Sequence, residues 1–319
     1  MTPAPSRACL NCRAPLGRRI LSKGELHLAS CTHCKLVQTE DVWPLERYAE
    51  WYAGIDSFST ETLGDVERFL ARDRRELERL AGQGGGGPML DVGAGAGTAT
   101  RAGLDRGWSV DAVELSHEAA IRLEVMGATV LREPVENLRL RAGHYGLVFM
   151  SHVLEHLRDP RGTLQTLQRC LMPGGLLQIA VPNWESLKRP LAGRGLGWIG
   201  VEHVSYFSPA TLTSLVEDLG FEVVERRVLP YECERDLDFA AALAERLRLD
   251  GVLARFMALE GGGLRDFIAA RARPTAAPWR SRLVVGMTHF GLALWPDRLC
   301  GVIGRADEVR LTVRRATEV

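Results

Sequence analysis

The sequence predicts an α/β protein built around a parallel sheet with helices on both faces. Short apolar segments that read as strands alternate with amphipathic segments that read as helices over residues 60–228. A glycine-rich loop over residues 93–97 directly follows one of these short strands. No apolar stretch reaches the roughly 18 residues that a membrane span needs. Alternating strands and helices of this kind are typical of parallel sheets that are buried on both sides.

Each element is predicted from its local pattern. Residues 60–80 carry apolar side chains at helical spacing with charges between them, which favours an amphipathic helix. Short apolar runs predict strands at residues 89–92, 109–114, 129–131, 146–150, 176–181, 221–228 and 309–314. Further helices are expected to end near residue 107 and to cover residues 117–126, 159–171 and 209–219, with a stop after the third at Pro173-Gly174-Gly175.

Composition narrows the classes of function. Of the 319 residues 46% are hydrophobic and 25% are charged, as in ordinary globular proteins. Lysine plus arginine equals aspartate plus glutamate at 40 each, so the basic excess of a dedicated nucleic-acid binder is missing and nucleic acid is not expected as a partner. Residues 1–15 hold no apolar core of signal-peptide length. The seven cysteines include two close pairs, which favours a reducing compartment and predicts a cytoplasmic protein.

The glycine-rich loop is the clearest sign of a bound cofactor. Residues 90–98 read Leu-Asp-Val-Gly-Ala-Gly-Ala-Gly-Thr, between a predicted strand and a predicted helix. Glycine is needed where the chain turns sharply and a ligand lies against bare backbone. Glu114 ends the second strand 21 residues after Gly93, where its carboxylate can accept hydrogen bonds from both hydroxyls of a ribose. A nicotinamide dehydrogenase usually has G-x-G-x-x-G here, and a structural turn without a ligand is the other alternative.

The loop and three later segments together resemble class I methyltransferases that use S-adenosylmethionine (SAM). These segments are residues 135–138 (Val-Glu-Asn-Leu), 152–160 (His-Val-Leu-Glu-His-Leu-Arg-Asp-Pro) and 171–175 (Leu-Met-Pro-Gly-Gly). The similarity covers about residues 65–228 and the final strand. It implies a Rossmann-like seven-stranded sheet in the order 3-2-1-4-5-7-6, with strand 7 antiparallel, and SAM as the cofactor.

The resemblance also implies a set of cofactor contacts. Asp91 and the loop glycines would hold the methionine end of SAM, Glu114 the ribose, and Val135 with Glu136 would lie near the adenine. The full cofactor-binding set expected from it is Asp91, Gly93, Gly95, Gly97, Glu114, Leu115, Val135, Glu136, Ser151 and His152. Gly146 and Pro134 depart from the family, which often has aspartate at both positions.

The paired cysteines predict a structural zinc ion. Cys9-x2-Cys12 and Cys31-x2-Cys34 are separated by 18 residues, the spacing of a four-cysteine zinc ribbon. Four thiolates leave no open coordination position, so the zinc would be structural. A ribbon before a methyltransferase domain resembles bacterial sugar C-methyltransferases and related enzymes of secondary metabolism or glycan synthesis, and also some ribosomal RNA methyltransferases. The sequence of residues 31–38 is more similar to the first group.

Two histidines are candidates for proton removal from the acceptor. His203 follows the fifth predicted strand, on the expected acceptor side, and is the first candidate for the general base, with His156 the second. A purely structural role for His203 is the alternative. The segment of His152, Glu155 and His156 also resembles the E-x-x-E-H metal motif of ubiquinone-pathway O-methyltransferases, so a second metal there stays open.

The chain is therefore divided into a zinc ribbon at 1–42, a SAM-binding domain at 43–232, a helical insertion or cap at 233–305, and the final strand at 306–319. An apolar stretch in the insertion is too short to span a bilayer. It is expected to form a cap or a homodimer helix, and a membrane-surface helix over 282–298 is the alternative. The predicted function is methyl transfer to an oxygen or carbon of a small molecule or glycan, with an RNA methyltransferase and a non-catalytic SAM-binding adaptor as alternatives.

Overall fold

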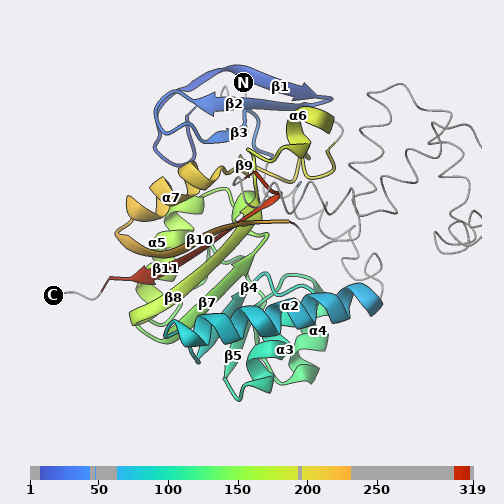
Figure 1. The fold of residues 1–319 in the computed structure, drawn as a ribbon, viewed down its shortest axis with the longest axis vertical. Coiled ribbons are helices and arrows are strands. Elements are labelled where there is room, and N and C mark those ends of the chain that lie inside the picture. Colours follow the sequence, from blue (N-terminus) through green and yellow to red (C-terminus); the bar gives the residue numbers. More distant parts are fainter. Residues whose placement is uncertain (1–7, 44–46, 48–62, 193–195, 231–304, 317–319) are drawn as a thin grey trace, which may run out of the picture. The chain divides into compact units, whose positions relative to one another are not determined.

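The computed structural model describes residues 8–43, 47, 63–192, 196–230 and 305–316 (Figure 1). The chain divides into two compact units. The first contains Met1–Trp184, Gly200–Val228 and Glu308–Val319, and the second contains Glu185–Ile199 and Leu229–Asp307. The predicted domain boundaries stay predictions, and residues 231–304, with the expected helix at 282–298, lie outside the described residues.

The main sheet of the first unit confirms the predicted fold class. Its strands lie in the order β10-β11-β8-β7-β4-β5-β6, which corresponds to the predicted 3-2-1-4-5-7-6 read from the other edge. The central pairs β4–β5, β4–β7, β5–β6 and β7–β8 are parallel, and β11 is antiparallel to β8. The strand bounds are β4 Met89–Val92, β5 Val110–Val113, β6 Thr129–Leu131, β7 Tyr145–Ser151, β8 Leu171–Pro182, β10 Phe221–Leu229 and β11 Glu308–Arg315.

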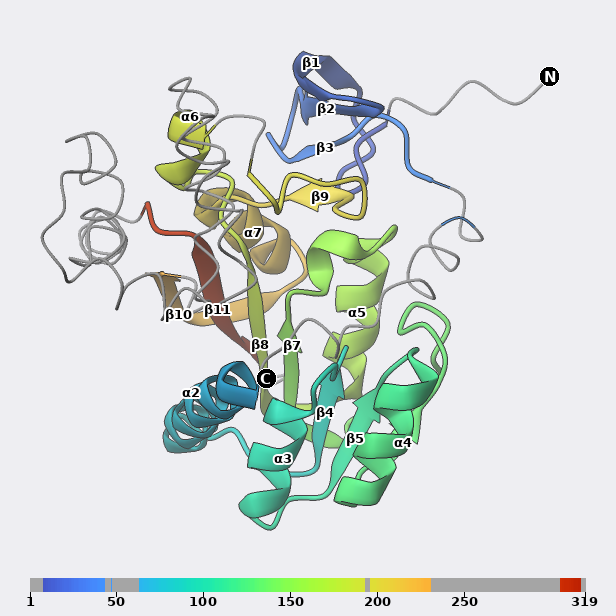
Figure 2. The same cartoon turned by 90° about the vertical axis from the view of Figure 1, so that its right-hand side faces the viewer.

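Helices cover both faces of this sheet because successive residues of its central strands point to opposite sides. Met89 and Leu147 belong to the apolar cluster that contains α2 and α3, whereas Leu90 and Val148 belong to the cluster that contains α5 and α7. Figure 2 shows α2 and α5 on opposite sides of the strands. The helix bounds are α2 Leu63–Gly82, α3 Thr98–Asp105, α4 His117–Met126, α5 Pro160–Cys170 and α7 Pro209–Glu217.

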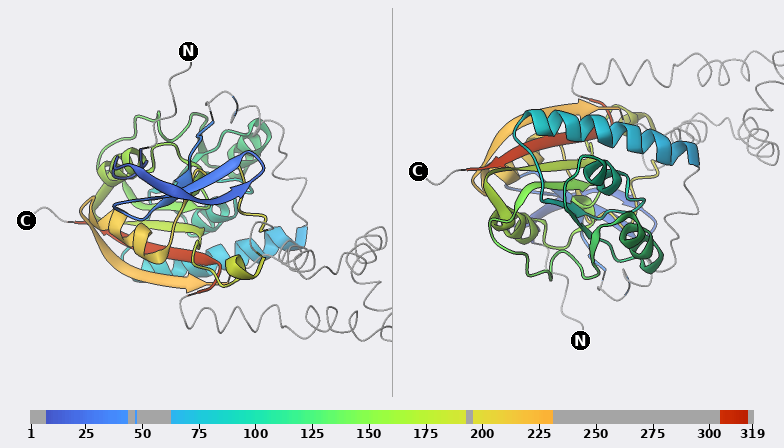
Figure 3. Two further views of the ribbon diagram at one scale, coloured as in Figure 1. Left: turned by 90° about the horizontal axis from the view of Figure 1, so that it is seen from above. Right: turned by 90° about the horizontal axis from the view of Figure 1, so that it is seen from below.

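A second sheet forms in the region predicted to be a zinc ribbon, for which no strands were predicted. It has four strands in the order β1-β2-β3-β9. Figure 3 (left) shows the blue N-terminal strands of this sheet from above. The first three belong to the ribbon, namely β1 Leu16–Lys23, β2 Leu26–Cys31 and β3 Val37–Thr39. The fourth, β9 Ser205–Tyr206, comes from a segment between β8 and α7 that carries no strand signal. The ribbon sheet is thus completed by residues far away in the sequence.

Two local features refine the prediction. The helix predicted for residues 159–171 is confirmed as α5, which ends at Cys170, but the following strand starts earlier than predicted, because β8 already begins at Leu171, where it pairs with Tyr145. The departure at Gly146 has a steric reason: a Cβ there would lie 2.7 Å from the backbone oxygen of Gly86, so an aspartate would not fit without movement of the backbone.

The second unit is described only in part. It contains the short helix α6 (Lys188–Ala192), which the sequence did not indicate. Asp307 connects the two segments of this unit. Its carboxylate accepts a hydrogen bond from the Ser186 hydroxyl and forms an ion pair with Lys188, each at 2.6 Å. No helix among the described residues has the length and hydropathy needed to cross a membrane.

Candidate active site and metal centre

The glycine loop leaves β4 in a conformation that suits glycine alone. Gly93, Gly95 and Gly97 have φ angles of 70°, 51° and 75°, in the left-handed region. A Cβ on Gly93 would lie 2.4 Å from a methyl carbon of Val153, so no side chain fits there. A Cβ on Gly95 would meet nothing closer than 4.0 Å. The bare backbone at Gly95 therefore borders open space, as a cofactor loop requires.

Glu114 lies beside this loop, as the sequence predicts. Its Oε2 accepts a hydrogen bond from the backbone N–H of Gly95 at 2.8 Å, and its Oε1 accepts one from the backbone N–H of Ser116 at 2.7 Å. These bonds fix the carboxylate, and each oxygen keeps a further acceptor position for a ribose hydroxyl. The neighbouring Leu115 has 57% of its surface exposed.

Asp91 points into the protein beneath the loop. It is 3% exposed, and its Oδ2 accepts a hydrogen bond from the Thr100 hydroxyl of α3 at 2.7 Å. Burial raises the pKa of Asp91 to about 7, and the negative charges of Asp73 and Glu114 act in the same direction, against the hydrogen bond from Thr100. This geometry favours a supporting role for Asp91 between β4 and α3.

The two residues expected near the adenine differ in burial. Val135 is buried and Glu136 is exposed. Glu136 Oε1 accepts hydrogen bonds from the backbone N–H groups of Arg158 and Asp159, at 3.0 and 3.4 Å. Glu136 therefore joins the loop after β6 to the segment that begins α5.

His152 follows Ser151, the last residue of β7, and has a φ of 55°, which is uncommon for a residue with a side chain. Its Nε2 lies 2.8 Å from Glu308 Oε2, and its Nδ1 lies 3.4 Å from Glu155 Oε1. Burial opposes protonation, but the bonds and charges of the two carboxylates outweigh it and raise the pKa of His152 to about 9. At neutral pH His152 is thus an imidazolium held between two carboxylates.

Glu308 is a site residue that the sequence did not indicate. It lies fully buried at the start of β11, one residue before the predicted strand begins. Burial acts to raise its pKa, but the charge of Arg310 and the bond and charge of His152 outweigh it and lower that pKa to about 2. Arg310 pairs with Glu308 and reaches Glu76 Oε2 at 3.4 Å. The one sequence feature that could have indicated this role of Glu308 is its position as an acidic residue directly before the predicted strand.

Glu155, His156 and His203 form a cluster that follows the end of β7. Glu155 and His156 lie in the short 3-10 helix η1 (Leu154–His156), and His203 precedes β9. Their potential ligand atoms lie within 4.8 Å of one another, and the two imidazole rings meet edge to face with centroids 4.6 Å apart. His156 Nδ1 donates to the backbone oxygen of Glu202 at 3.0 Å, which leaves Nε2 facing the Glu155 carboxylate at 4.0 Å.

The charge of this cluster depends on the buried Glu155. Burial acts to raise the pKa of Glu155, but the bond from His152 and the charges of His156, His152 and His203 outweigh it and lower the pKa. Glu155 therefore stays a carboxylate next to both candidate bases. His203 itself is 8% exposed. The structure thus brings together the two histidines that the sequence singled out.

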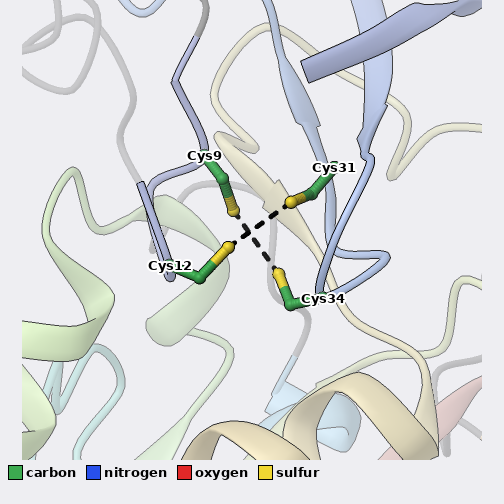
Figure 4. Close-up of side chains that lie close together, drawn as sticks. All are labelled: Cys9, Cys12, Cys31 and Cys34. Atoms are coloured by element: carbon green, nitrogen blue, oxygen red, sulfur yellow. Dashed lines mark hydrogen bonds between the residues drawn. The ribbon is translucent and has the colours of Figure 1, made fainter. Parts of the chain in front are cut away.

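The four cysteines of the ribbon also converge (Figure 4). Their sulfur atoms lie within 4.8 Å of one another, and the two nearest pairs are Cys9–Cys34 and Cys12–Cys31, each at 3.5 Å. This is far longer than the roughly 2.05 Å of a disulfide and close to the sulfur spacing around a tetrahedral zinc ion with Zn–S bonds of about 2.3 Å. The hydrogen bond with Cys9 lowers the pKa of Cys34, which favours the thiolate form that a metal ion binds.

Comparison with known proteins places the core of the chain in one family. Residues 63–226 match the family model described as a methyltransferase domain, which is 164 of 319 residues. Ubiquinone biosynthesis O-methyltransferases are similar in sequence. The protein from Caulobacter vibrioides is 30% identical over 176 residues, which is 50% of this chain and 67% of the relative. The protein from Caulobacter sp. K31 is 31% identical over 38% of this chain and 49% of the relative. The match thus spans about half to two thirds of the length of these relatives.

Two solved structures show lower similarity. A SAM-dependent methyltransferase from Archaeoglobus fulgidus is 17% identical, with a TM-score of 0.49 over 78% of this chain and 94% of that chain. A Burkholderia thailandensis 1,6-didemethyltoxoflavin N1-methyltransferase with bound S-adenosylhomocysteine is 14% identical, with a TM-score of 0.48 over 94% of this chain and 100% of that chain. The family assignment therefore rests on the domain model. Since that model covers just over half of the residues, the chain belongs to the family of SAM-dependent class I methyltransferases.

Proposed function

We propose that this protein transfers the methyl group of SAM to an oxygen or carbon atom of a small molecule or glycan. One observation carries the proposal, namely that the element that carries His156 begins directly after the residue that lies against the cofactor loop. Val153 lies against Gly93, and η1, with Glu155 and His156, begins directly after Val153. His203 lies against His156. An acceptor between the loop and these histidines would have its reacting atom close to both.

The chain would bind SAM through the bare backbone at Gly95 and through the carboxylate of Glu114. SAM supplies a methyl group on a positively charged sulfur, which an electron pair of the acceptor can attack. His203 would take the proton of the acceptor O–H or C–H onto a ring nitrogen. The electron pair of that bond forms the new bond to the methyl carbon, and the methyl–sulfur bond breaks to release S-adenosylhomocysteine.

The remaining groups of the site would position the base. Glu155, held as a carboxylate, lies 4.0 Å from His156 Nε2, and its negative charge would stabilise an imidazolium that forms nearby. His156 is the second candidate base, since its Nδ1 proton is already committed to the Glu202 carbonyl and its Nε2 can accept. The names of the relatives favour an oxygen atom as the acceptor.

A labelling screen tests the proposal. The purified protein is incubated with methyl-labelled SAM and, in parallel, with small-molecule extracts, glycan fractions and total RNA. Label in a small molecule or glycan, identified by mass spectrometry, is the expected result. Label in RNA alone would instead support an RNA methyltransferase, and SAM binding without transfer to any fraction would support a non-catalytic adaptor. A Gly95→Asp variant, which places a charged side chain in the open space of the loop, is the matched inactive control.

We also propose that Cys9, Cys12, Cys31 and Cys34 bind one structural zinc ion. The convergence of four thiols with no disulfide supports it. Metal analysis of protein purified under reducing conditions is expected to find about one zinc per chain. A Cys34→Ser variant should lose it, whereas a variant of the exposed neighbour His33→Ala should retain it. Protein without zinc that keeps four reactive thiols would contradict the assignment.

A further inference from the structure

The ribbon and the candidate base are connected through backbone hydrogen bonds. One residue, Val204, separates His203 from β9. This strand pairs antiparallel with β3, with Val37 opposite Tyr206 and Gln38 opposite Ser205. In addition, the backbone N–H of Thr39 donates to the Val204 oxygen at 3.0 Å. Figure 2 shows β9 directly beside β3. The segment that carries His203 is therefore a strand of the ribbon sheet.

The opposite side of the same segment is bound to the catalytic elements. The backbone N–H of Val204 donates to the backbone oxygen of Glu155 at 2.8 Å, so Val204 links the ribbon to η1. Three residues later, Phe207 forms a bridge with Asn183, directly after β8, and its backbone oxygen accepts a hydrogen bond from the backbone N–H of Trp184 at 2.8 Å. His203 thus lies between the ribbon on one side and the end of the main sheet on the other.

The position of β3 depends in turn on the cysteine knuckles. Gln38 is 2% exposed, and its Oε1 accepts a hydrogen bond from the backbone N–H of Leu10, inside the first knuckle, at 2.7 Å. β3 begins three residues after Cys34, in the second knuckle. A metal ion that joins the two knuckles would therefore fix the strand on which the His203 segment rests. Small metal modules of this kind draw much of their stability from the metal itself.

We infer that the metal-bound ribbon is a positioning device for the acceptor side of the active site, and that it acts through the pairing of β3 with β9. This inference rests on the proposed function, because only that function makes His203 and His156 candidate bases. The inference predicts that methyl transfer depends on the ribbon, whereas SAM binding does not. The glycine loop and Glu114 directly follow β4 and β5, which share no strand pairing with the ribbon, so SAM binding should not need the metal.

The test compares three forms of the full-length protein: the parent, Cys34→Ser and the control His33→Ala. Hydrogen–deuterium exchange of residues 200–208, SAM affinity by calorimetry, zinc content, and transfer of labelled methyl to a small-molecule extract are measured for each. Loss of zinc in Cys34→Ser should speed exchange in 200–208 and lower transfer by about 10- to 100-fold, as expected when a catalytic group shifts by roughly 1 Å. SAM affinity should stay within about twofold of the parent. His33→Ala should match the parent in all four.

A second variant covers the case in which Cys34→Ser fails to fold. Gln38→Ala removes the buried link between the first knuckle and β3 but leaves every cysteine in place. It should retain zinc and still speed exchange in 200–208. Unchanged exchange in 200–208 after zinc loss, or in Gln38→Ala, overturns the inference. The separate variant His203→Ala distinguishes the two ideas: if it transfers methyl at the parent rate while zinc loss still loosens 200–208, the base assignment fails and the ribbon's hold on the segment stands.

Discussion

The donor side and the acceptor side of this site are built in different ways. The donor side, here the glycine loop and Glu114, comes from one continuous stretch, residues 91–116, in which each strand leads directly into the next turn. The acceptor side, here Glu155, His156 and His203, is held by the ends of β7 and β8, by β3 of the ribbon and by β11 at the end of the chain. The proposed donor side is therefore a local motif, whereas the proposed acceptor side depends on tertiary contacts.

Removal of the candidate base should separate the two sides most strongly. His203→Ala is expected to lower turnover by about 10²- to 10⁴-fold, roughly 3 to 5 kcal/mol of barrier, because any other group would be a poorer acceptor for the proton of the substrate. SAM affinity should stay unchanged, since the donor side is built independently. Initial rates and calorimetry measure the two effects, with the exposed His117→Ala as the control. Parent-like turnover in a folded variant would move the base to His156.

The buried pair of His152 and Glu308 should show itself in the dependence of stability on pH. The folded pKa of His152, about 9, is higher than the roughly 6.5 of an unfolded histidine. The pair therefore contributes its full stability below about pH 6.5 and loses it as the pH rises through 9. Glu308→Gln should cost about 1.5 to 3 kcal/mol near pH 6, as for a lost hydrogen bond to a charged group.

Thermal or urea unfolding between pH 6 and 10 measures this effect. The difference between the parent and Glu308→Gln should shrink above about pH 9. Glu124→Gln, which removes the surface pair with Arg132, should give a small difference that stays constant over this range. A constant difference for Glu308→Gln as well would show that His152 is neutral in the folded protein.

Glu114→Ala tests the donor side alone. Loss of the ribose contacts should weaken SAM binding about tenfold, or about 1.4 kcal/mol, and loss of the bond to the Gly95 N–H should loosen the glycine loop. Calorimetry compares it with Glu118→Ala on the outer face of α4. Exchange of residues 200–208 should not change, because they are held by the acceptor side. Parent-like affinity would remove Glu114 from the site.

The smallest effect is expected for a surface ion pair that touches neither side. Arg101→Ala removes an exposed i,i+4 pair with Asp105 on α3. It should change stability by no more than about 0.5 kcal/mol and leave both SAM affinity and turnover at the parent level. A clear loss of SAM binding in this variant would mean that α3 transmits strain to the glycine loop, and the two sides would then be less separate than the contacts indicate.

The same contrast explains what the sequence could predict. The strands of the main sheet and the glycine loop could be predicted because local apolar runs and closely spaced glycines encode them, and the strand order followed from the resemblance to class I methyltransferases. β9 has only two residues, too few to show a period of two. The contact of His152 with Glu308 joins residues 156 apart in the sequence, and no local pattern reports such a pair.

The ribbon was predicted in its metal ligands but not in its architecture. The cysteine spacing gave the four converging thiols, because that spacing follows from the geometry of one metal ion. The three ribbon strands were not predicted, and they appear only in the structure. The family and the SAM cofactor are confirmed, while the individual cofactor contacts, the zinc ion and the base stay predictions.

The pairing of β3 with β9 has a consequence for any shortened form of this protein. A chain that begins after residue 43 would lose β1, β2 and β3, and the backbone groups of Val204 to Tyr206 that pair with the ribbon would become an open strand edge. Exposed edges of this kind recruit strands from other molecules and promote aggregation. The methyltransferase domain alone is therefore expected to be poorly soluble. A peptide added to restore its solubility should pair with the open edge as a strand rather than bind through charge.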